Sequence, residues 1–530
     1  MLDLGRTFLQ SVERNPGACA LVDGDTRLTY ADALVRIGGA VRALGAAGLA
    51  RGDHLLVVLQ NRWQMAVLHW ACQFAGVIVT PLNWRAKAEE IDYCLKDSLA
   101  KAIVYEPVSA AAVADSVLAQ RVLRVGLGGA AGAQQRLEHW LAAEAAPAPQ
   151  ARADDWSLML YTSGTTGKPK GVPRRHRAER AAALAHVAQN RYAYGERTLG
   201  VMPLYHTMGV RSLLALALLD GTLVCMPKFD AGTAIELIER ERLTHLYLVP
   251  TLYHDVLAHP SFRSERVQTV RKLGFAGAPM HDALLQRLDA AFRPDLFVNH
   301  YGSSEIYTFS INQDAVRKPG SAGKSGINAR LRVVKLDAAT PDDLAARREE
   351  GQIIADLAGD EAFEGYHNRP DANAKALRDG WYFTGDTGYV DDDGDLYVTG
   401  RVDDMIISGG ENISPVDIES VLSLHPAVDE VAVAGLSDER WGQKVVAFVK
   451  PRSAAVDAAA LDAHCRQSDL VNFKRPREYV FVQEIPKSPV GKILRRKLVA
   501  GEFEVVREPL SPTSPTAPAA PTAAAAEVTR

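Results

Sequence analysis

Short apolar runs alternate with segments of helical spacing along this chain, and that alternation restricts its fold more than any other feature. Four runs have the length and composition of buried strands: 54–60, 243–249, 272–276 and 296–300. Helical spacing with polar or charged ends lies beside them, at 232–242 and 281–292. The alternation predicts an α/β fold in which helices are layered on mostly buried sheets.

The length of the chain, 530 residues, exceeds what one hydrophobic core usually holds, so we expect at least two domains. The pattern changes after residue 401. The expected elements there are two strands, a helix and a strand, at 429–436, 443–451, 458–468 and 478–483. From residue 507 the chain is rich in proline and alanine without apolar periodicity, which is typical of disorder.

Charge and cysteine content exclude several classes of protein. Sixty basic against sixty-four acidic residues give a net charge of −4, so neither nucleic acid nor an anionic membrane is an expected partner. The start of the chain carries Asp3 and no long apolar core, which argues against a secretory signal. Five cysteines lie far apart without a Cys-x-x-Cys pair, which argues against a disulfide framework or a zinc site and favours the cytoplasm.

Residues 161–172 combine five hydroxylated side chains, three glycines and two lysines after an apolar run. Backbone N–H groups at glycines, hydroxyls and ammonium groups are the donors that hold a polyphosphate. Gly164 and Gly167 are too close together for the P-loop of NTPases, and Pro169 follows Lys168 where that motif has Ser or Thr. The alternative is a surface loop of ordinary Ser/Thr/Gly composition.

Four further segments follow in a fixed order: 301–305, 382–386, 400–404 and 486–492. With 161–172 they resemble the signatures of the adenylate-forming superfamily, which comprises acyl- and aryl-CoA ligases, firefly-type luciferases and peptide-synthetase adenylation domains. Four segments are similar to bacterial aryl-CoA ligases of the 4-chlorobenzoate type: 202–206, 400–413, 440–443 and 472–476.

The resemblance implies a large N-terminal domain of layered α/β sheets, 1–402, that binds ATP and the acid. A small, mobile α+β domain, 403–506, would carry the catalytic lysine and turn about Asp403, and 507–530 would be the disordered tail. The implied reaction joins a small carboxylic acid to AMP at the expense of ATP, with Mg²⁺, and CoA then displaces the AMP.

Each expected site residue lies in a segment that matches the superfamily. The phosphates of ATP are expected at Thr162, Ser163, Gly164, Thr165, Thr166, Gly167 and Lys170. The adenosine is expected at Gly277, Ala278, Tyr301, Asp386 and Arg401. Glu305 would hold Mg²⁺ beside Ser304, which stands where many relatives have threonine. Without the resemblance, Glu305 would be an ordinary helix N-terminal residue and Asp386 an ordinary turn residue.

Lys492 is the residue expected to stabilise charge during adenylation, whereas its basic neighbours 495–497 are interpreted as a solvated face without a role. His206 precedes the acid pocket and would act as a gate, the alternative being an ordinary loop histidine. The groups expected to meet CoA are Arg85, Gly409, Gly410, Trp441, Phe473, Arg475 and Arg477.

The expected acid pocket consists of Thr207, Met208, Asn299, His300, Gly302, Tyr307 and Thr308. These residues are more polar than a halobenzoate pocket, and Met208 and Tyr307 are bulky, which favours a small ring acid such as 2-furoate or a hydroxybenzoate. The alternatives are a medium-chain fatty acid–CoA ligase, an enzyme that loads a carrier protein, a luciferase-like oxygenase and a non-catalytic nucleotide-binding module. A homodimer is left open.

Overall fold

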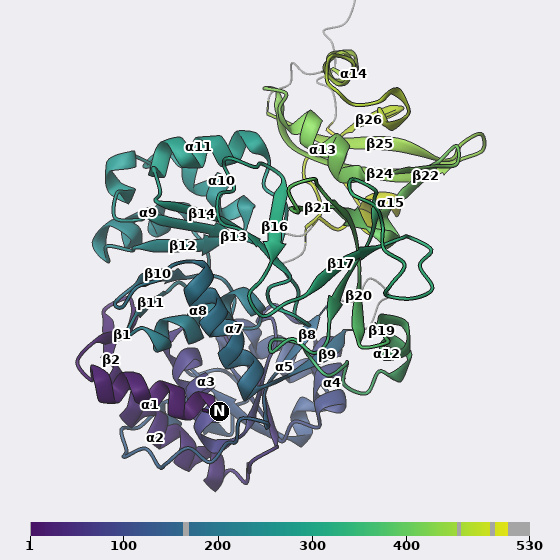
Figure 1. Cartoon of the computed structure of the whole chain (residues 1–530). Coiled ribbons are helices and arrows are strands. Elements are labelled where there is room, and N and C mark those ends of the chain that lie inside the picture. Colours follow the sequence, from purple (N-terminus) through teal and green to yellow (C-terminus); the bar gives the residue numbers. More distant parts are fainter. Residues whose placement is uncertain (1, 163–168, 453–456, 488–492, 507–530) are drawn as a thin grey trace, which may run out of the picture.

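The structure is a computed structural model that describes residues 2–162, 169–452, 457–487 and 493–506. Figure 1 shows a large N-terminal part, in which helices and sheets are layered, and a smaller C-terminal part above it. This is the mixed α/β architecture expected from the alternation of apolar runs and helical segments.

The first sheet of the N-terminal part has a parallel centre and an antiparallel extension. Its first half runs β2 (Thr26–Thr29), β1 (Cys19–Asp23), β11 (Thr222–Cys225), β10 (Arg197–Gly200), β12 (His245–Leu248), β13 (Lys272–Phe275) and β14 (Leu296–Tyr301). It continues through β15 (Ser310–Asn312), β16 (Ser321–Ser325), β21 (Leu396–Arg401), β20 (Trp381–Val390), β18 (Gly351–Asp356) and β17 (Leu331–Val334), with β19 (Leu377–Arg378) beside β20.

The second sheet is parallel except at its last pair. Its order is β7 (Gln135–Arg136), β6 (Leu123–Gly126), β5 (Ala102–Tyr105), β3 (His54–Val58), β4 (Ile78–Pro81), β8 (Trp156–Thr162) and β9 (Lys170–Arg175). Every residue of β3, β4 and β5 is buried, as expected for parallel strands covered on both faces.

Two packed helices separate the sheets: α7 (His176–Gln189) contacts β8 and β9, whereas α8 (Thr207–Leu218) contacts β10, β11 and β12. Figure 1 shows α9 (Ala231–Arg240), α10 (Pro250–Ala258) and α11 (Asp282–Phe292) along the first sheet. The remaining helices of the N-terminal part are α1 (Leu4–Arg14), α2 (Tyr30–Ala46), α3 (Trp63–Ala75), α4 (Ala88–Ser98), α5 (Ala110–Asp115), α6 (Leu137–Trp140) and α12 (Pro370–Ala376).

The C-terminal part is a five-stranded sheet flanked by helices. Its strands are β22 (Ile406–Ser408), β23 (Glu411–Ile413), β24 (Val428–Asp438), β25 (Gly442–Pro451) and β26 (Glu478–Phe481). Its helices are α13 (Pro415–Ser423), α14 (Ala458–Gln467) and α15 (Arg495–Val499). The expected order of two strands, a helix and a strand is confirmed by β24, β25, α14 and β26.

The two parts meet at a short 3₁₀ turn, Val402–Asp404, which contains the expected hinge residue Asp403. The Ser414 hydroxyl donates to the backbone carbonyl of Thr399, and His254 Nε2 lies 3.7 Å from Asp429 Oδ1. The first contact joins β21 to the start of α13, and the second joins α10 to β24.

Arg495 departs from its sequence interpretation. Rather than forming a solvated face, its guanidinium lies 2.7 Å from Glu419 and 3.3 Å from Asp404, with only 14% of its side chain exposed. Arg495 therefore anchors α15 to α13 and to the turn between the two parts.

All five cysteines lie in described residues and are free thiols. Among the described helices, none combines the length and apolar character that a membrane span needs.

Candidate active site

The hairpin of β8 and β9 frames the segment expected to hold phosphate. Thr162 pairs with Lys170 across the hairpin, whereas Ser163, Gly164, Thr165, Thr166 and Gly167 lie outside the described residues. The Lys170 ammonium lies 4.4 Å from the centroid of the Tyr366 ring. Burial lowers the pKa of Lys170, and the nearby charge of Glu305 opposes that shift. Lys170 and Glu305 therefore belong to one charged site.

Glu305 is held in a fixed orientation. The hydroxyl of Tyr366 donates to its Oε1 at 2.7 Å and lies 3.2 Å from the hydroxyl of Tyr382. The backbone N–H of Glu305 donates to Ser303 Oγ at 3.2 Å, while Arg174 donates to its carbonyl at 2.8 Å. A single oriented carboxylate of this kind suits Mg²⁺, which commonly binds one or two carboxylates together with phosphate oxygens. The sequence interpretation missed Tyr366, which lies outside every recognised motif.

Tyr301, Asp386 and Arg401 come together although they are far apart in the sequence. Asp386 is opposite Arg401 in the β20–β21 pair, and Arg401 Nε lies 3.0 Å from its Oδ1. Tyr301, at the end of β14, donates to Oδ2 of the same carboxylate at 2.5 Å. Burial, with the charge of Asp386, raises the pKa of Tyr301, which therefore stays a neutral donor. This arrangement is suited to a sugar diol, since carboxylates accept hydrogen bonds from paired hydroxyls.

Two of the expected site residues are glycines for different reasons, Gly277 because of its backbone conformation and Gly302 because of close packing. Gly277, with φ +85°, would place a Cβ 3.3 Å from Val249 and 3.9 Å from the sulfur of Met208. A Cβ on Gly302 would lie 2.0 Å from the carbonyl oxygen of Tyr307, which no side chain could tolerate. Ala278 follows Gly277 in the loop after β13, and Ser304 is buried beside Glu305.

His206 caps the N-terminus of α8, where its Nδ1 accepts from the backbone N–H of Met208 at 3.4 Å. Thr207 and Met208 begin the same helix and are buried. Asn299 donates to the carbonyl of Ser321 at 2.9 Å. The expected acid residues therefore come from the start of α8 and from the end of β14 with its following loop.

Tyr307 belongs to the expected acid pocket, but its hydroxyl donates to Glu179 Oε2 at 3.1 Å. Its ring lies 4.2 Å from the guanidinium of Arg174, which pairs with Glu179 at 2.8 Å. The Tyr307 hydroxyl is therefore bonded within the protein.

Arg211 is a second group that sequence interpretation missed. It is 2% exposed, donates to the Thr308 hydroxyl at 2.7 Å and to the Tyr307 carbonyl at 3.1 Å, and also contacts the Tyr247 hydroxyl. The signal that could have found it is an arginine inside the apolar sequence of a buried helix, because buried arginines need specific partners.

The C-terminal part assembles most of the residues expected to meet CoA. Gly409 donates its N–H to the carbonyl of Trp441 at 2.8 Å, and a Cβ there would lie 2.9 Å from the indole. Gly410 follows with φ +87°, and Arg477 lies 5.8 Å from the Trp441 ring. Phe473 is 41% exposed, and Arg475 donates to Asn472. Lys492 lies outside the described residues.

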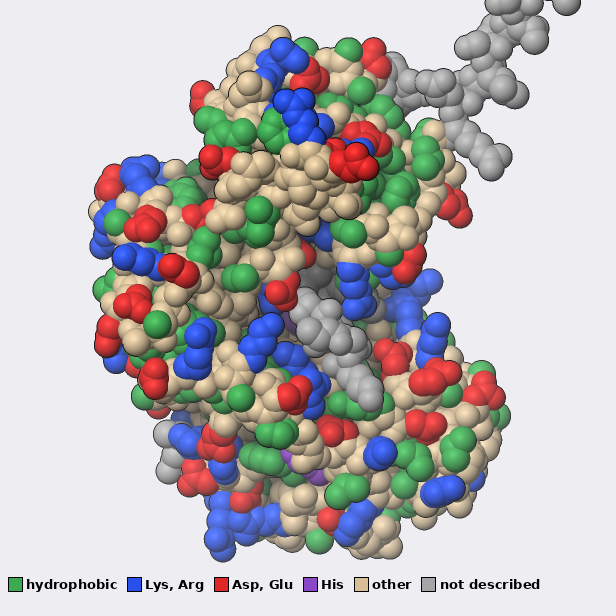
Figure 2. Space-filling model, turned by 90° about the vertical axis from the view of Figure 1, so that its right-hand side faces the viewer, with side chains coloured by type: hydrophobic (Ala, Val, Ile, Leu, Met, Phe, Trp, Pro, Cys, Tyr) green, Lys and Arg blue, Asp and Glu red, His purple; other side chains and the backbone are tan. Residues whose placement is uncertain are grey.

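Arg85 is the exception among these residues, since it lies on the N-terminal part, where its guanidinium stacks 3.6 Å from the Trp84 ring. Burial raises the pKa of Tyr205, the residue before His206, and the positive charge of Arg85 opposes that rise. Figure 2 shows a hollow between the two parts with Lys and Arg side chains on both of its sides, as a polyanionic substrate requires.

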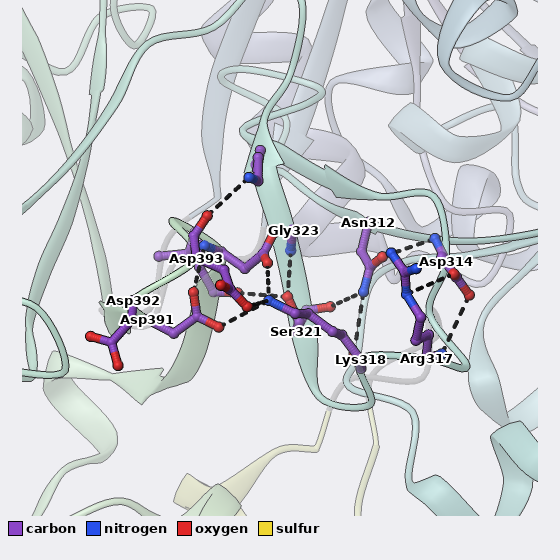
Figure 3. Close-up of polar contacts among 12 residues, drawn as sticks. Asn312, Asp314, Arg317, Lys318, Ser321, Gly323, Asp391, Asp392 and Asp393 are labelled. Carbon is purple, nitrogen blue, oxygen red and sulfur yellow. Dashed lines mark hydrogen bonds and ion pairs between the residues drawn. The ribbon is translucent and has the colours of Figure 1, made fainter.

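Asp391, Asp393 and Asp395 form an acidic cluster in the turn between β20 and β21. Lys318 lies among the three carboxylates, 3.3 Å from Asp391 and 2.6 Å from Asp393, as Figure 3 shows. These hydrogen bonds raise the pKa of Lys318. The ammonium offsets part of the negative charge of the three carboxylates and ties the turn between β20 and β21 to the segment before β16.

This chain is similar to several known proteins. A family described as AMP-binding enzyme matches residues 8–367, and its C-terminal domain family matches residues 417–492. A 4-chlorobenzoate–CoA ligase of Arthrobacter sp is 34% identical over 92% of this chain and 93% of its own length. A long-chain-fatty-acid–CoA ligase of Mycobacterium tuberculosis is 33% identical over 94% and 98%. The solved structure of the anthranilate CoA ligase AuaEII with anthranoyl-AMP matches with a TM-score of 0.87 and 25% identity, covering 94% of this chain and 97% of that one.

Proposed function

We propose that this chain, which belongs to the AMP-binding enzyme family, activates a small aromatic or heteroaromatic carboxylic acid such as a benzoate or 2-furoate. It is an AMP-forming acyl-CoA synthetase that uses ATP, Mg²⁺ and CoA. The acid is the part of the function that needs an argument of its own, because the relatives act on aryl and on fatty acids alike.

The first half of the reaction joins two anions. A carboxylate oxygen attacks the α-phosphorus of ATP, the bond to the bridging oxygen breaks, and diphosphate leaves. In the proposed site Tyr301, Asp386 and Arg401 position the nucleoside, while Thr162 and Lys170 stand at the phosphates. Glu305, oriented by Tyr366, would hold Mg²⁺, which when bound supplies positive charge against the phosphate oxygens. Lys492 is the proposed stabiliser of charge at the reacting carboxylate.

The second half transfers the acyl group to CoA. The thiolate sulfur attacks the acyl carbon, the bond to the AMP oxygen breaks, and AMP leaves. We propose that a turn about Asp403 withdraws Lys492 and brings the Gly409–Trp441 contact to the site. Gly409 has no side chain to fill the space beside the Trp441 indole, which suits the narrow pantetheine arm of CoA. Arg85, Arg475 and Arg477 then remain for the phosphates of CoA.

The observation that carries the choice of acid is the polar packing around the expected acid pocket. The pocket residues Tyr307 and Thr308 are bonded to buried Arg211, and His300 is buried against His186. The methylenes of a long alkyl chain would have to pack against a guanidinium and two imidazoles, and burying those polar groups against an apolar chain costs free energy. A small ring ends before that region or meets it with a polar substituent.

The test is a comparison of kcat/KM for benzoate, 2-furoate, 4-chlorobenzoate and octanoate, measured as CoA-dependent AMP release with saturating ATP and Mg²⁺. The best ring acid is expected to exceed octanoate at least about tenfold. A preference for octanoate would replace the proposal with the medium-chain alternative. AMP formation that CoA does not accelerate would favour a carrier protein as the acceptor.

A further inference from the structure

A cluster of buried polar side chains fills the space between α7, α8 and the first sheet. His186 and Asn190 come from the end of α7, Arg211 from α8, Tyr247 from β12 and His300 from β14, and each is at most 2% exposed. The ring centroids of His186, Tyr247 and His300 lie 4.8 to 5.2 Å from one another. The Arg211 guanidinium lies 5.2 Å from the Tyr247 ring.

The hydrogen bonds of Asn190 fix the protons on both histidines. Its amide nitrogen donates to the backbone carbonyl of His186 at 2.8 Å. The same nitrogen lies 2.9 Å from Nδ1 of His186, and because an amide nitrogen can only donate, this Nδ1 must accept. The amide oxygen of Asn190 lies 3.2 Å from Nε2 of His300, which must therefore donate. Burial, reinforced by the charge of Arg211, holds the pKa of both imidazoles well below the ordinary value, so both are neutral. The remaining proton of His186 is then on Nε2, and Nδ1 of His300 carries a free lone pair.

Three polar atoms of this cluster have no partner in the described structure: Nε of Arg211, Nε2 of His186 and Nδ1 of His300. The first two are donors and the third is an acceptor. Buried donors and acceptors without partners are costly, so a polar group bound by these three atoms would be stabilised. A hydroxyl matches this set, because its oxygen accepts two hydrogen bonds and its proton is donated once. A carboxylate or an ether oxygen has no proton to donate to His300. A chlorine atom offers neither a proton to donate nor an oxygen that accepts two hydrogen bonds.

The cluster is continuous with the expected acid pocket. Arg211 lies one helical turn after Thr207 and Met208 on α8, and it bonds the backbone of Tyr307 and the hydroxyl of Thr308. His300 and Tyr301 are consecutive on β14 and so point to opposite faces of the strand, with the cluster on one side and the bond from Tyr301 to Asp386 on the other. A ring whose carboxylate faces the nucleotide would therefore direct its far edge toward the cluster.

The geometry points to an aromatic acid that carries a ring hydroxyl, bound by Arg211, His186 and His300. Nε of Arg211 and Nε2 of His186 donate to the hydroxyl oxygen, and Nδ1 of His300 accepts its proton. This assignment rests on the proposed function, since it names the substituent on the same ring acid.

The test compares kcat/KM for 3- and 4-hydroxybenzoate with benzoate and with the corresponding methoxybenzoates, which accept but do not donate. One hydroxybenzoate is expected to exceed benzoate at least about tenfold, because a site built to bond a hydroxyl discriminates against analogues that lack it. Two variants, His300→Leu and Arg211→Lys, should each bring the ratio of kcat/KM for the hydroxybenzoate to kcat/KM for benzoate close to one, by raising the KM for the hydroxybenzoate. The matched control is His69→Leu, which also removes a buried histidine with unpartnered ring nitrogens, in α3, and should retain the ratio.

The outcomes separate this inference from the proposed function. Turnover of benzoate and hydroxybenzoates with equal kcat/KM would overturn the hydroxyl assignment and leave the ring-acid proposal standing, with water as the partner of the cluster. Absence of turnover with every ring acid, beside turnover of octanoate, would overturn both. Should His300→Leu fail to fold, Arg211→Lys and the wild-type comparison still decide the question.

Discussion

The hydroxyl of Tyr301 donates to Oδ2 of Asp386 at 2.5 Å, while Arg401 lies 3.0 Å from the other oxygen of the same carboxylate. The two contacts come from different strands and hold the carboxylate from both sides. A hydrogen bond to a charged oxygen on one side and an ion pair on the other orient the carboxylate strongly. Asp386 is thus held in one orientation, which in the proposed site lowers the ordering cost of binding the nucleotide.

Removing the Tyr301 hydroxyl should weaken the nucleotide site without removing the ring. Tyr301→Phe is expected to raise the KM for ATP about fivefold to thirtyfold, because a hydrogen bond to a charged group is lost, with a smaller effect on kcat. Steady-state kinetics with varied ATP check this. Tyr389→Phe, whose ring stacks on Tyr397 in the same hairpin, is the control. An unchanged KM for ATP would remove Tyr301 from the nucleotide site.

The contact between Tyr366 and Glu305 gives a prediction about Mg²⁺. Tyr366→Phe should raise the Mg²⁺ concentration for half-maximal rate about tenfold, because a group that orients a metal ligand is lost. Excess Mg²⁺ should restore the rate. Tyr105→Phe, in which another buried hydroxyl is removed, should keep the wild-type Mg²⁺ dependence. Loss of rate that no Mg²⁺ concentration restores would contradict the assignment of Glu305 to the metal.

The two half-reactions should respond differently to Lys492. Lys492→Ala is expected to slow acyl-adenylate formation on the order of 100-fold to 1000-fold, because one oriented charge is removed, and to leave thioester formation from supplied acyl-AMP nearly unchanged. Single-turnover measurements of each half separate the effects. Lys497→Ala, a partly exposed lysine paired with Glu502, is the control. Equal loss in both halves would refute the use of different groups for the two steps.

Buried histidines predict how stability depends on pH. Burial lowers the pKa of His54 to about 4, whereas an unfolded histidine has a pKa of about 6.5. Between these values the unfolded chain binds more protons, so the free energy of unfolding falls as pH falls, by at most about 3 kcal/mol for this group. The expected result is a Tm that decreases from pH 7.5 to pH 5, less steeply in His54→Gln. His139→Gln, at an exposed site, should leave the slope unchanged, and a Tm independent of pH would refute the prediction.

Element identity could be predicted from the sequence because local pattern and burial agree. The predicted helix 232–242 is α9, Ala231–Arg240, and Asp230 caps it by accepting from Thr233. The predicted strand 243–249 begins two residues late, at His245, because the N–H of Leu243 still closes the helix by donating to Ile238. Such end effects depend on backbone hydrogen bonds that apolar periodicity does not report.

The polar residues outside the motifs could not be predicted in the same way. Arg495 begins the basic stretch 495–497, and only the fold brings Glu419 and Asp404 to it. Arg211, His186 and His300 are far apart in sequence, and their common cluster depends on how α7 and α8 pack against β14. In the proposed function the motifs supply the groups that meet the nucleotide, whereas the contacts of Arg211, His186 and His300 select the acid.

The most direct test of the account follows oxygen from the acid to AMP. With a carboxyl-¹⁸O ring acid, ATP, Mg²⁺ and CoA, the account predicts one ¹⁸O in the AMP for each acyl-CoA formed, both read by mass spectrometry. Acyl-CoA formed with unlabelled AMP would show that the acid was never joined to the α-phosphorus, and would contradict the proposed reaction at its first step.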